Sequence, residues 1–260
     1  RTWIKDRLWF DGELSIPFFN VLKTSNTEVA NRLSAYFIEM AAINPTFIDA
    51  SNFYKINSTL DFEIEWGLGS SSSLISNLAY WAKIDPYELH FRISKGSGYD
   101  IACSRSDGPL LYKLSDGKPY VEAVDFAPPF KNNLYFVYSG NKQDSSASVS
   151  NYLSNKKPGT GGYLKKLRAI TNKIVDCREL DTFEELISEH EEMIGQLINM
   201  PPVKEEYYPD FEGHIKSLGA WGGDFLLVTW KGDRKALEEY FSGKGLDVLF
   251  AYDEIIKNQA

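Results

Sequence analysis

The stretch EWGLGSSSSLISNLAYW, from Glu65 to Trp81, joins two glycines and four consecutive serines to a run with helical spacing. Leu74 and Leu78 fall on one side of that run, so we expect a buried helix over about Ser71–Lys83. Glycines let the backbone turn so that several N–H groups point into one space. A helix start adds unpaired N–H groups and the positive end of the helix dipole. The stretch therefore predicts either a cradle for an anion such as phosphate, or a plain serine cap after a loop. It does not match the GxxxxGK[ST] phosphate loop.

Composition narrows the classes of protein that this chain can belong to. The 260 residues are 43% hydrophobic and 25% charged, which is enough apolar material for a large core. A net charge of −8 argues against a general nucleic-acid binder. No apolar run reaches the length of a membrane helix, and no signal peptide is visible. The two cysteines, Cys103 and Cys177, lie far apart, so we expect free thiols and a cytoplasmic location. The three histidines are not at metal-ligand spacing, so the sequence argues against a His/Cys metal site.

Hairpin-like and helical segments alternate without a regular βαβ pattern, so we expect an α+β fold. Two prolines at 128 and 129 interrupt the pattern, and we place a domain boundary there, with domains at 1–130 and 131–260. Asp11-Gly12 is a hairpin signal, and Asp85 before Pro86 is typical of a helix start. We expect further helices at about 28–43, 164–176, 182–200 and 233–242, and strands within 1–19, 53–66, 95–114, 133–140 and 224–230.

Two more glycine-rich stretches could carry chemistry. In Lys95–Ala102 (KGSGYDIA), Asp100 follows two glycines and we expect it to enter an apolar strand. It could be a buried carboxylate that acts as a base or as a partner for a substrate hydroxyl, or simply a turn residue. Lys216–Asp224 (KSLGAWGGD) is again rich in glycine and precedes a strand, but alone it is typical of many sharp turns. The GTGG at 159–162 favours an ordinary loop. No GxSxG nucleophile motif is present.

Taken in order, the three stretches resemble the motifs of the GHMP small-molecule kinases. Gly67-Leu68-Gly69-Ser70-Ser71 matches the family's P-x-x-x-G-L-G-S-S, with Glu63 in place of the usual proline. Ser97–Ala102 is similar to the family's G-x-x-S-G-x-D-x-A, and GSGYDIA resembles the signature of the bacterial GYDIA-type subgroup. Lys216, Gly219, Ala220, Gly222 and Gly223 match K-x-x-G-A-G-x-G, with Trp221 replacing a glycine.

The resemblance implies a two-domain α+β kinase fold, with a ribosomal-protein-S5-like N-terminal domain and a ferredoxin-like C-terminal domain. It implies that ATP binds with its phosphates over Gly67, Leu68, Gly69, Ser70, Ser71 and Ser72. Ser71 would help to hold Mg²⁺, and Glu88 lies roughly where mevalonate kinases have a second Mg²⁺ carboxylate. Asp100 matches the acid beside the substrate hydroxyl. Gly219, Ala220, Gly222 and Gly223 would shape the floor of the site.

The expected activity is transfer of the ATP γ-phosphoryl group to a hydroxyl or phosphate of a small metabolite. Mevalonate and phosphomevalonate, from isoprenoid biosynthesis, are the first candidates, and homoserine or a sugar is the alternative. The partner would be this small-molecule substrate, with neither nucleic acid nor a membrane, and a homodimer is left open. The family's first motif, which carries a Lys beside the catalytic Asp, is not found, and we expect it in a segment before Arg1. A catalytically silent relative that binds a nucleotide or metabolite, and a structural protein with accidental glycine turns, are the competing hypotheses.

Overall fold

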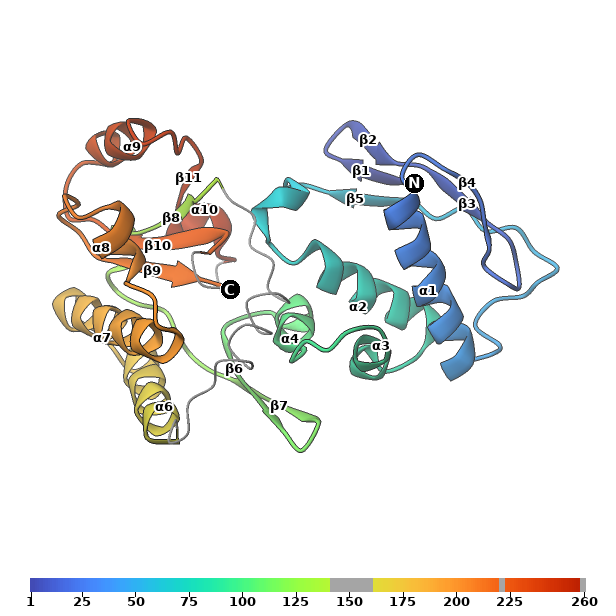
Figure 1. The fold of residues 1–260 in the computed structure, drawn as a ribbon, viewed down its shortest axis with the longest axis horizontal. Coiled ribbons are helices and arrows are strands. Elements are labelled where there is room, and N and C mark those ends of the chain that lie inside the picture. Colours follow the sequence, from blue (N-terminus) through green and yellow to red (C-terminus); the bar gives the residue numbers. More distant parts are fainter. Residues whose placement is uncertain (141–160, 220–222, 258–260) are drawn as a thin grey trace. The chain divides into compact units, whose positions relative to one another are not determined.

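The computed structural model describes residues 1–140, 161–219 and 223–257. The chain forms two compact units (Figure 1), one made of residues 1–106 and 110–123 and the other of residues 107–109 and 124–260. Both units contain helices and strands, so the expected α+β class is confirmed. No helix within the described ranges is long and apolar enough to cross a membrane.

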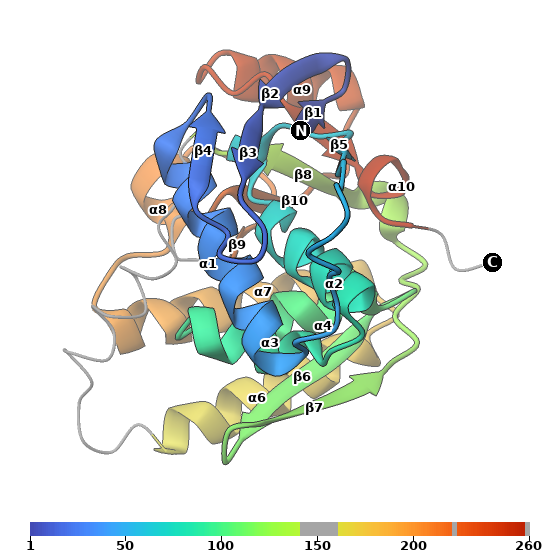
Figure 2. The same cartoon turned by 90° about the vertical axis from the view of Figure 1, so that its right-hand side faces the viewer.

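Unit 1 combines small sheets with a group of helices. Strand β1 pairs antiparallel with β2 and parallel with β5, while β3–β4 and β6–β7 are two antiparallel pairs. The β6–β7 pair is a two-stranded ribbon in Figures 1 and 2. The elements are β1 (Thr2–Ile4), β2 (Arg7–Phe10), β3 (Gly12–Leu14), β4 (Val21–Thr24), α1 (Thr27–Ile43), β5 (Ser58–Leu60), the 3₁₀ turn η1 (Ile64–Trp66), α2 (Ser70–Ala82), α3 (Pro86–Ile93), α4 (Tyr99–Arg105), β6 (Leu110–Ser115) and β7 (Lys118–Ala123).

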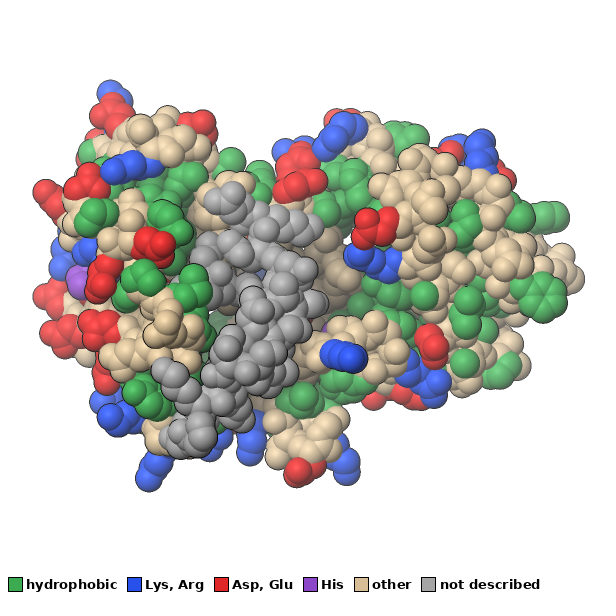
Figure 3. Space-filling model, in the orientation of Figure 1, with side chains coloured by type: hydrophobic (Ala, Val, Ile, Leu, Met, Phe, Trp, Pro, Cys, Tyr) green, Lys and Arg blue, Asp and Glu red, His purple; other side chains and the backbone are tan. Residues whose placement is uncertain are grey.

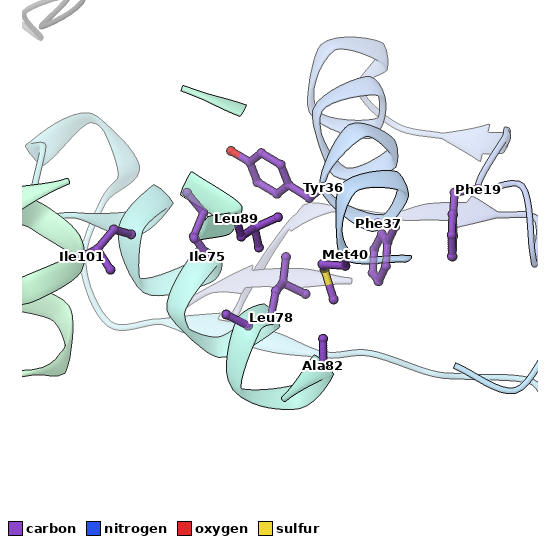
Figure 4. Packing of buried hydrophobic residues seen from close by; sticks show 10 residues of the cluster. Phe19, Tyr36, Phe37, Met40, Ile75, Leu78, Ala82, Leu89 and Ile101 are labelled. Carbon is purple, nitrogen blue, oxygen red and sulfur yellow. The ribbon is translucent and has the colours of Figure 1, made fainter. Parts of the chain in front are cut away.

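The core of unit 1 lies where the apolar faces of α1, α2 and α3 meet. Met40, Leu78 and Leu89 are at most 5% exposed, and Figure 4 shows their side chains grouped within this cluster. The ring of Phe37 stacks on Phe19 at 5.4 Å between centroids. Burial of these faces holds α2 in place, so the segment that leads into it is attached to a packed helix.

Three local predictions for unit 1 are wrong. Asp11-Gly12 is not a hairpin turn, because it joins β2 to β3, and the first hairpin turns at Lys5, whose φ is +51°. The alternating run at 53–66 forms only the short strand β5 and one 3₁₀ turn. The segment after Gly98 is a helix instead of a strand, because Gly98 caps a turn that buries Ile101 and Ala102 together.

Unit 2 is built on a four-stranded antiparallel sheet with the order β11-β8-β10-β9. This order and the alternation of strands and helices are compatible with the ferredoxin-like half that the resemblance implies, and that finer name stays a prediction. The elements are the 3₁₀ turn η2 (Lys131–Asn133), β8 (Leu134–Tyr138), α6 (Gly161–Val175), α7 (Leu180–Ile198), α8 (Val203–Tyr207), β9 (Ile215–Leu218), β10 (Phe225–Thr229), α9 (Arg234–Ser242), β11 (Leu249–Ala251) and α10 (Tyr252–Ile255).

Helices cover both faces of this sheet. Leu134 and Leu227 pack with α6 and α7, whereas Val137 and Val228 pack with α8 and α9. Successive side chains of a strand point to opposite faces, which accounts for the nearly unbroken apolar sequence of β8 and β10. On the face of the molecule shown in Figure 3, basic and acidic side chains are interspersed.

Candidate active site

The two glycines before α2 both adopt the left-handed conformation that side chains disfavour. Gly67 has φ +67° and Gly69 has φ +82°, with Leu68 exposed between them. A Cβ on Gly69 would also come within 3.0 Å of Ser72 Oγ. The turn therefore needs glycine at these positions for a backbone reason.

The first turn of α2 presents backbone N–H groups that the helix itself does not use. Gly69 is the N-cap residue and no side chain caps the helix. The first helical hydrogen bond runs from the N–H of Ser73 to the carbonyl of Gly69, at 3.0 Å. The N–H groups of Ser70, Ser71 and Ser72 have no carbonyl one turn earlier within the helix, and they lie at its positive end. This geometry suits a bound anion.

The serines of this turn differ in what their side chains can reach. The side chain of Ser71 is exposed and that of Ser70 is half-buried. Ser72 is buried, and its hydroxyl donates to the carbonyl of Gly69 at 2.9 Å. Ser72 can therefore offer a ligand its backbone N–H but not its hydroxyl, whereas Ser71 can offer both.

Asp100 lies in the same unit, as an exposed residue in the first turn of α4. α4 packs against α2, where Ser104 Oγ lies 2.7 Å from Ser76 Oγ. Ile101, which follows Asp100, is fully buried in the core that also holds α2 (Figure 4). The structure thus brings the glycine-serine turn and Asp100 onto two adjacent helices of one packed unit.

The charge of Asp100 affects two neighbouring groups. Burial raises the pKa of Tyr112, and the charges of Tyr87 and Asp100 add to the effect. Burial likewise raises the pKa of the Cys103 thiol, with Asp100 as the second cause. Asp100 therefore contributes to the electrostatic surroundings of Tyr112 and Cys103.

Glu88 forms an ion pair within its own helix, at the i,i+4 spacing typical of such pairs. Its carboxylate lies 3.0 Å from the guanidinium of Arg92, one turn later in α3, and Arg92 also contacts Glu39 at 3.4 Å. Its role as a Mg²⁺ ligand stays a prediction and would require Arg92 to release it.

The described residues contain no group of three or more His, Cys, Asp or Glu that could hold a metal. Mg²⁺ that accompanies a nucleotide is bound mainly by phosphate oxygens and water, so Ser71 and one carboxylate would be a sufficient protein contribution.

The third glycine-rich stretch is the connection between the antiparallel strands β9 and β10 of unit 2. Gly219 has φ +74° and Gly223 has φ +39°. A Cβ on Gly223 would lie 2.6 Å from the carbonyl oxygen of Leu218, so no side chain fits there. Ser139 Oγ donates to the carbonyl of Gly223 at 2.6 Å. Ala220, Trp221 and Gly222 lie outside the described residues, as does part of the GTGG loop. The contribution of this turn to a site stays a prediction.

Sequence reasoning missed the buried acids of α7. Glu184 and Glu191 lie two turns apart on the face of α7 that packs against the sheet, and both are buried. Glu191 Oε1 is 3.0 Å from Lys216 Nζ at the start of the third stretch, and Glu184 accepts a hydrogen bond from Thr229 at 2.7 Å. The sequence signal for them is a seven-residue spacing of acids, in a helix otherwise rich in exposed glutamates.

Unit 1 also contains an apolar cavity of about 590 Å³. It lies between α1, the β3–β4 pair and the segment 48–56, and Leu74 and Leu78 of α2 contribute to its wall. Its lining is mostly hydrophobic, so it suits an apolar group and differs in chemistry from the turn at Gly67–Ser72.

Comparison with known proteins finds similar folds among solved structures but no match at the level of sequence. No family model matches the chain, and no curated protein matches its sequence. Among solved structures, a Lin0012 protein from Listeria innocua is similar with a TM-score of 0.61 and 16% identity, over 96% of this chain and 84% of that one. The L. major mevalonate kinase in complex with R-mevalonate is similar with a TM-score of 0.55 and 13% identity, over 96% of this chain and 81% of that one. The class that these findings define is a mixed α+β chain with a mevalonate kinase-like fold.

Proposed function

We propose that this protein is a GHMP-type kinase that transfers the γ-phosphoryl group of ATP to a small metabolite. The first turn of α2 carries the proposal, because it combines two left-handed glycines, uncapped N–H groups and an exposed Ser71. The likeness of the fold to a mevalonate kinase supports the same conclusion. Mevalonate or phosphomevalonate is the acceptor that we propose first.

The residues of unit 1 divide the work of the reaction. The N–H groups of Ser70, Ser71 and Ser72 would bind the phosphates and stabilise the charge that builds up on them. Asp100 would accept the proton of the acceptor hydroxyl, or orient that hydroxyl. The oxygen of the acceptor hydroxyl forms a bond to the γ-phosphorus while the bond between that phosphorus and ADP breaks. Mg²⁺, when bound, supplies charge neutralisation at the phosphates, and the Ser71 hydroxyl would be one of its ligands. Catalysis of this kind depends on positioning, which a turn attached to a packed helix provides.

Asp100→Asn tests the proposal. The wild type and the variant are assayed for ADP release with mevalonate, phosphomevalonate, homoserine and galactose. Because a positioned base contributes about 10²–10⁴-fold, we expect kcat to fall by about 100-fold or more while KM for ATP changes little. Asp116→Asn, at the tip of the β6–β7 hairpin, is the matched control and should keep full activity.

Each other outcome has a defined meaning. Full activity of Asp100→Asn would remove Asp100 from the mechanism. Turnover of homoserine or galactose alone would move the acceptor away from the mevalonate branch. ATP binding without turnover of any acceptor would contradict the kinase and support a nucleotide-binding protein instead.

A further inference from the structure

The segment that leads into α4 is held by two side chains from other elements. His90 of α3 has its Nε2 atom 3.3 Å from the carbonyl oxygen of Gly96. Tyr112 of β6 donates its hydroxyl to the next carbonyl, that of Ser97, at 2.5 Å. We call this pair of contacts the His90–Tyr112 clamp. The two contacts reach successive peptide groups from two different elements, the preceding helix α3 and the following strand β6.

The space around the clamp is closed on the side of Gly98. A Cβ on Gly98 would lie 3.4–3.5 Å from atoms of Tyr87, His90 and Tyr112. Gly98 is buried, with φ +81°, and its carbonyl accepts the first hydrogen bonds of α4, from Ile101 and Ala102. The three rings therefore surround the residue at which the chain turns into the helix.

The chemistry of the His90 contact defines which ring nitrogen is the donor. A carbonyl oxygen can only accept, so the hydrogen bond exists only when Nε2 carries the hydrogen. The other ring nitrogen, Nδ1, is buried with no partner among the described residues. The imidazole is therefore used as a single directed donor toward Gly96.

Fixing two successive carbonyls fixes two peptide planes, because each peptide unit is planar. The planes 96–97 and 97–98 in turn set the direction in which α4 begins. Asp100 is the second residue of α4, so the direction of its Cα–Cβ bond depends on these two planes together with the backbone dihedrals of Gly98 and Tyr99. The hydroxyl of Tyr112 also lies within the field of the Asp100 carboxylate, which contributes to its raised pKa.

We propose that His90 and Tyr112 are positioning residues for Asp100, acting through the carbonyls of Gly96 and Ser97. The inference rests on the proposed kinase function, because it assigns what holds the proposed base in place. Neither residue needs to touch the substrate. Small displacements of a reacting group reduce rates strongly, so loss of either contact should act mainly on kcat.

The test uses Tyr112→Phe, His90→Leu and His90→Gln, because the amide of glutamine keeps an N–H donor. Tyr120→Phe is the control, since Tyr120 lies on the neighbouring strand β7 and is exposed. We expect Tyr112→Phe and His90→Leu to lower kcat at least about tenfold with KM for ATP changed less than about twofold. His90→Gln should recover most of the loss, and Tyr120→Phe should match the wild type.

Hydrogen exchange provides a readout that does not depend on activity. Amides of 99–105 should exchange at least about tenfold faster in Tyr112→Phe and His90→Leu, while those of α2 stay unchanged. Unchanged exchange in both variants would overturn the clamp. Faster exchange with unchanged kcat would overturn its role in positioning Asp100. If the wild type turns over no acceptor, the kinase proposal fails, and the role of the clamp in catalysis fails with it, whatever the exchange shows.

Discussion

At the scale of single residues, Gly69 is the residue on which the proposed phosphate turn depends. Its φ of +82° is unfavourable for any residue with a Cβ, and Ser72 Oγ leaves that Cβ little room. We expect Gly69→Ala to lower stability by about 1–2 kcal/mol. It should also turn the N–H groups of Ser70 and Ser71 away from a bound phosphate, so that ATP binds at least about tenfold more weakly.

A matched control separates strain from ligand binding. Gly117, at the tip of the β6–β7 hairpin, also has a positive φ, +72°, but a Cβ added there would meet no atom within 4 Å. Gly117→Ala should therefore lose similar stability and keep ATP affinity. Thermal unfolding with and without ATP and Mg²⁺ measures both effects, because a ligand at a hundredfold its Kd adds about 2.7 kcal/mol. Equal ATP affinity in the two variants would contradict the role of Gly69.

At the scale of elements, α3 begins where local sequence signals coincide. The carboxylate of Asp85 accepts a hydrogen bond from the N–H of Tyr87 at 2.9 Å, and Pro86 occupies the first helical position. We expect Asp85→Ala to lower the free energy of unfolding by about 1 kcal/mol. Asp233 stands at the same position of α9 without a side-chain hydrogen bond, so Asp233→Ala should cost only a few tenths. Urea unfolding of both variants checks this difference, and equal losses would contradict the capping argument.

For some helices, local sequence signals alone are sufficient to predict where the helix begins. α2 begins within one residue of its predicted start and α9 within one of its predicted start, because glycine or aspartate marks each boundary. The sequence instead predicts a turn followed by strands within 95–114, with Asp100 entering an apolar strand, because the apolar run there is too short to carry a helical period. The helix at this position depends on the left-handed Gly98 and on contact with α2, which no local pattern reports.

At the scale of the whole molecule, the half-buried His190 of unit 2 links folding to pH. Burial, and secondarily the charge of Lys216, lower the pKa of His190 to about 4. The unfolded chain takes up this proton near its ordinary pKa of about 6.5, and the folded chain only near pH 4. The stability from His190 is therefore fully present above pH 6.5 and is lost as the pH falls toward 4.

His190→Gln tests this linkage. The ring is partly exposed and screened by solvent, so we expect the wild type to lose about 1 kcal/mol more than the variant between pH 7 and pH 5. Denaturant unfolding at the two pH values gives the stability loss of each protein. The effects of other titrating groups are the same in wild type and variant, so they cancel when the two losses are subtracted. Parallel losses in wild type and variant would show that His190 does not titrate differently on folding.

The sequence by itself determined the α+β class, most helices, and the two left-handed glycines before α2, because these depend on periodicity, caps and backbone sterics within a few residues. Only the tertiary structure decided that Asp100 lies on a helix, that His90 and Tyr112 reach the turn before it, and that Arg92 of α3 also reaches Glu39 of α1. Those contacts join residues through packing of separate elements, and a single sequence contains no local signal for them. The chain thus encodes its turns locally, whereas the surroundings of its candidate catalytic residue arise from long-range burial.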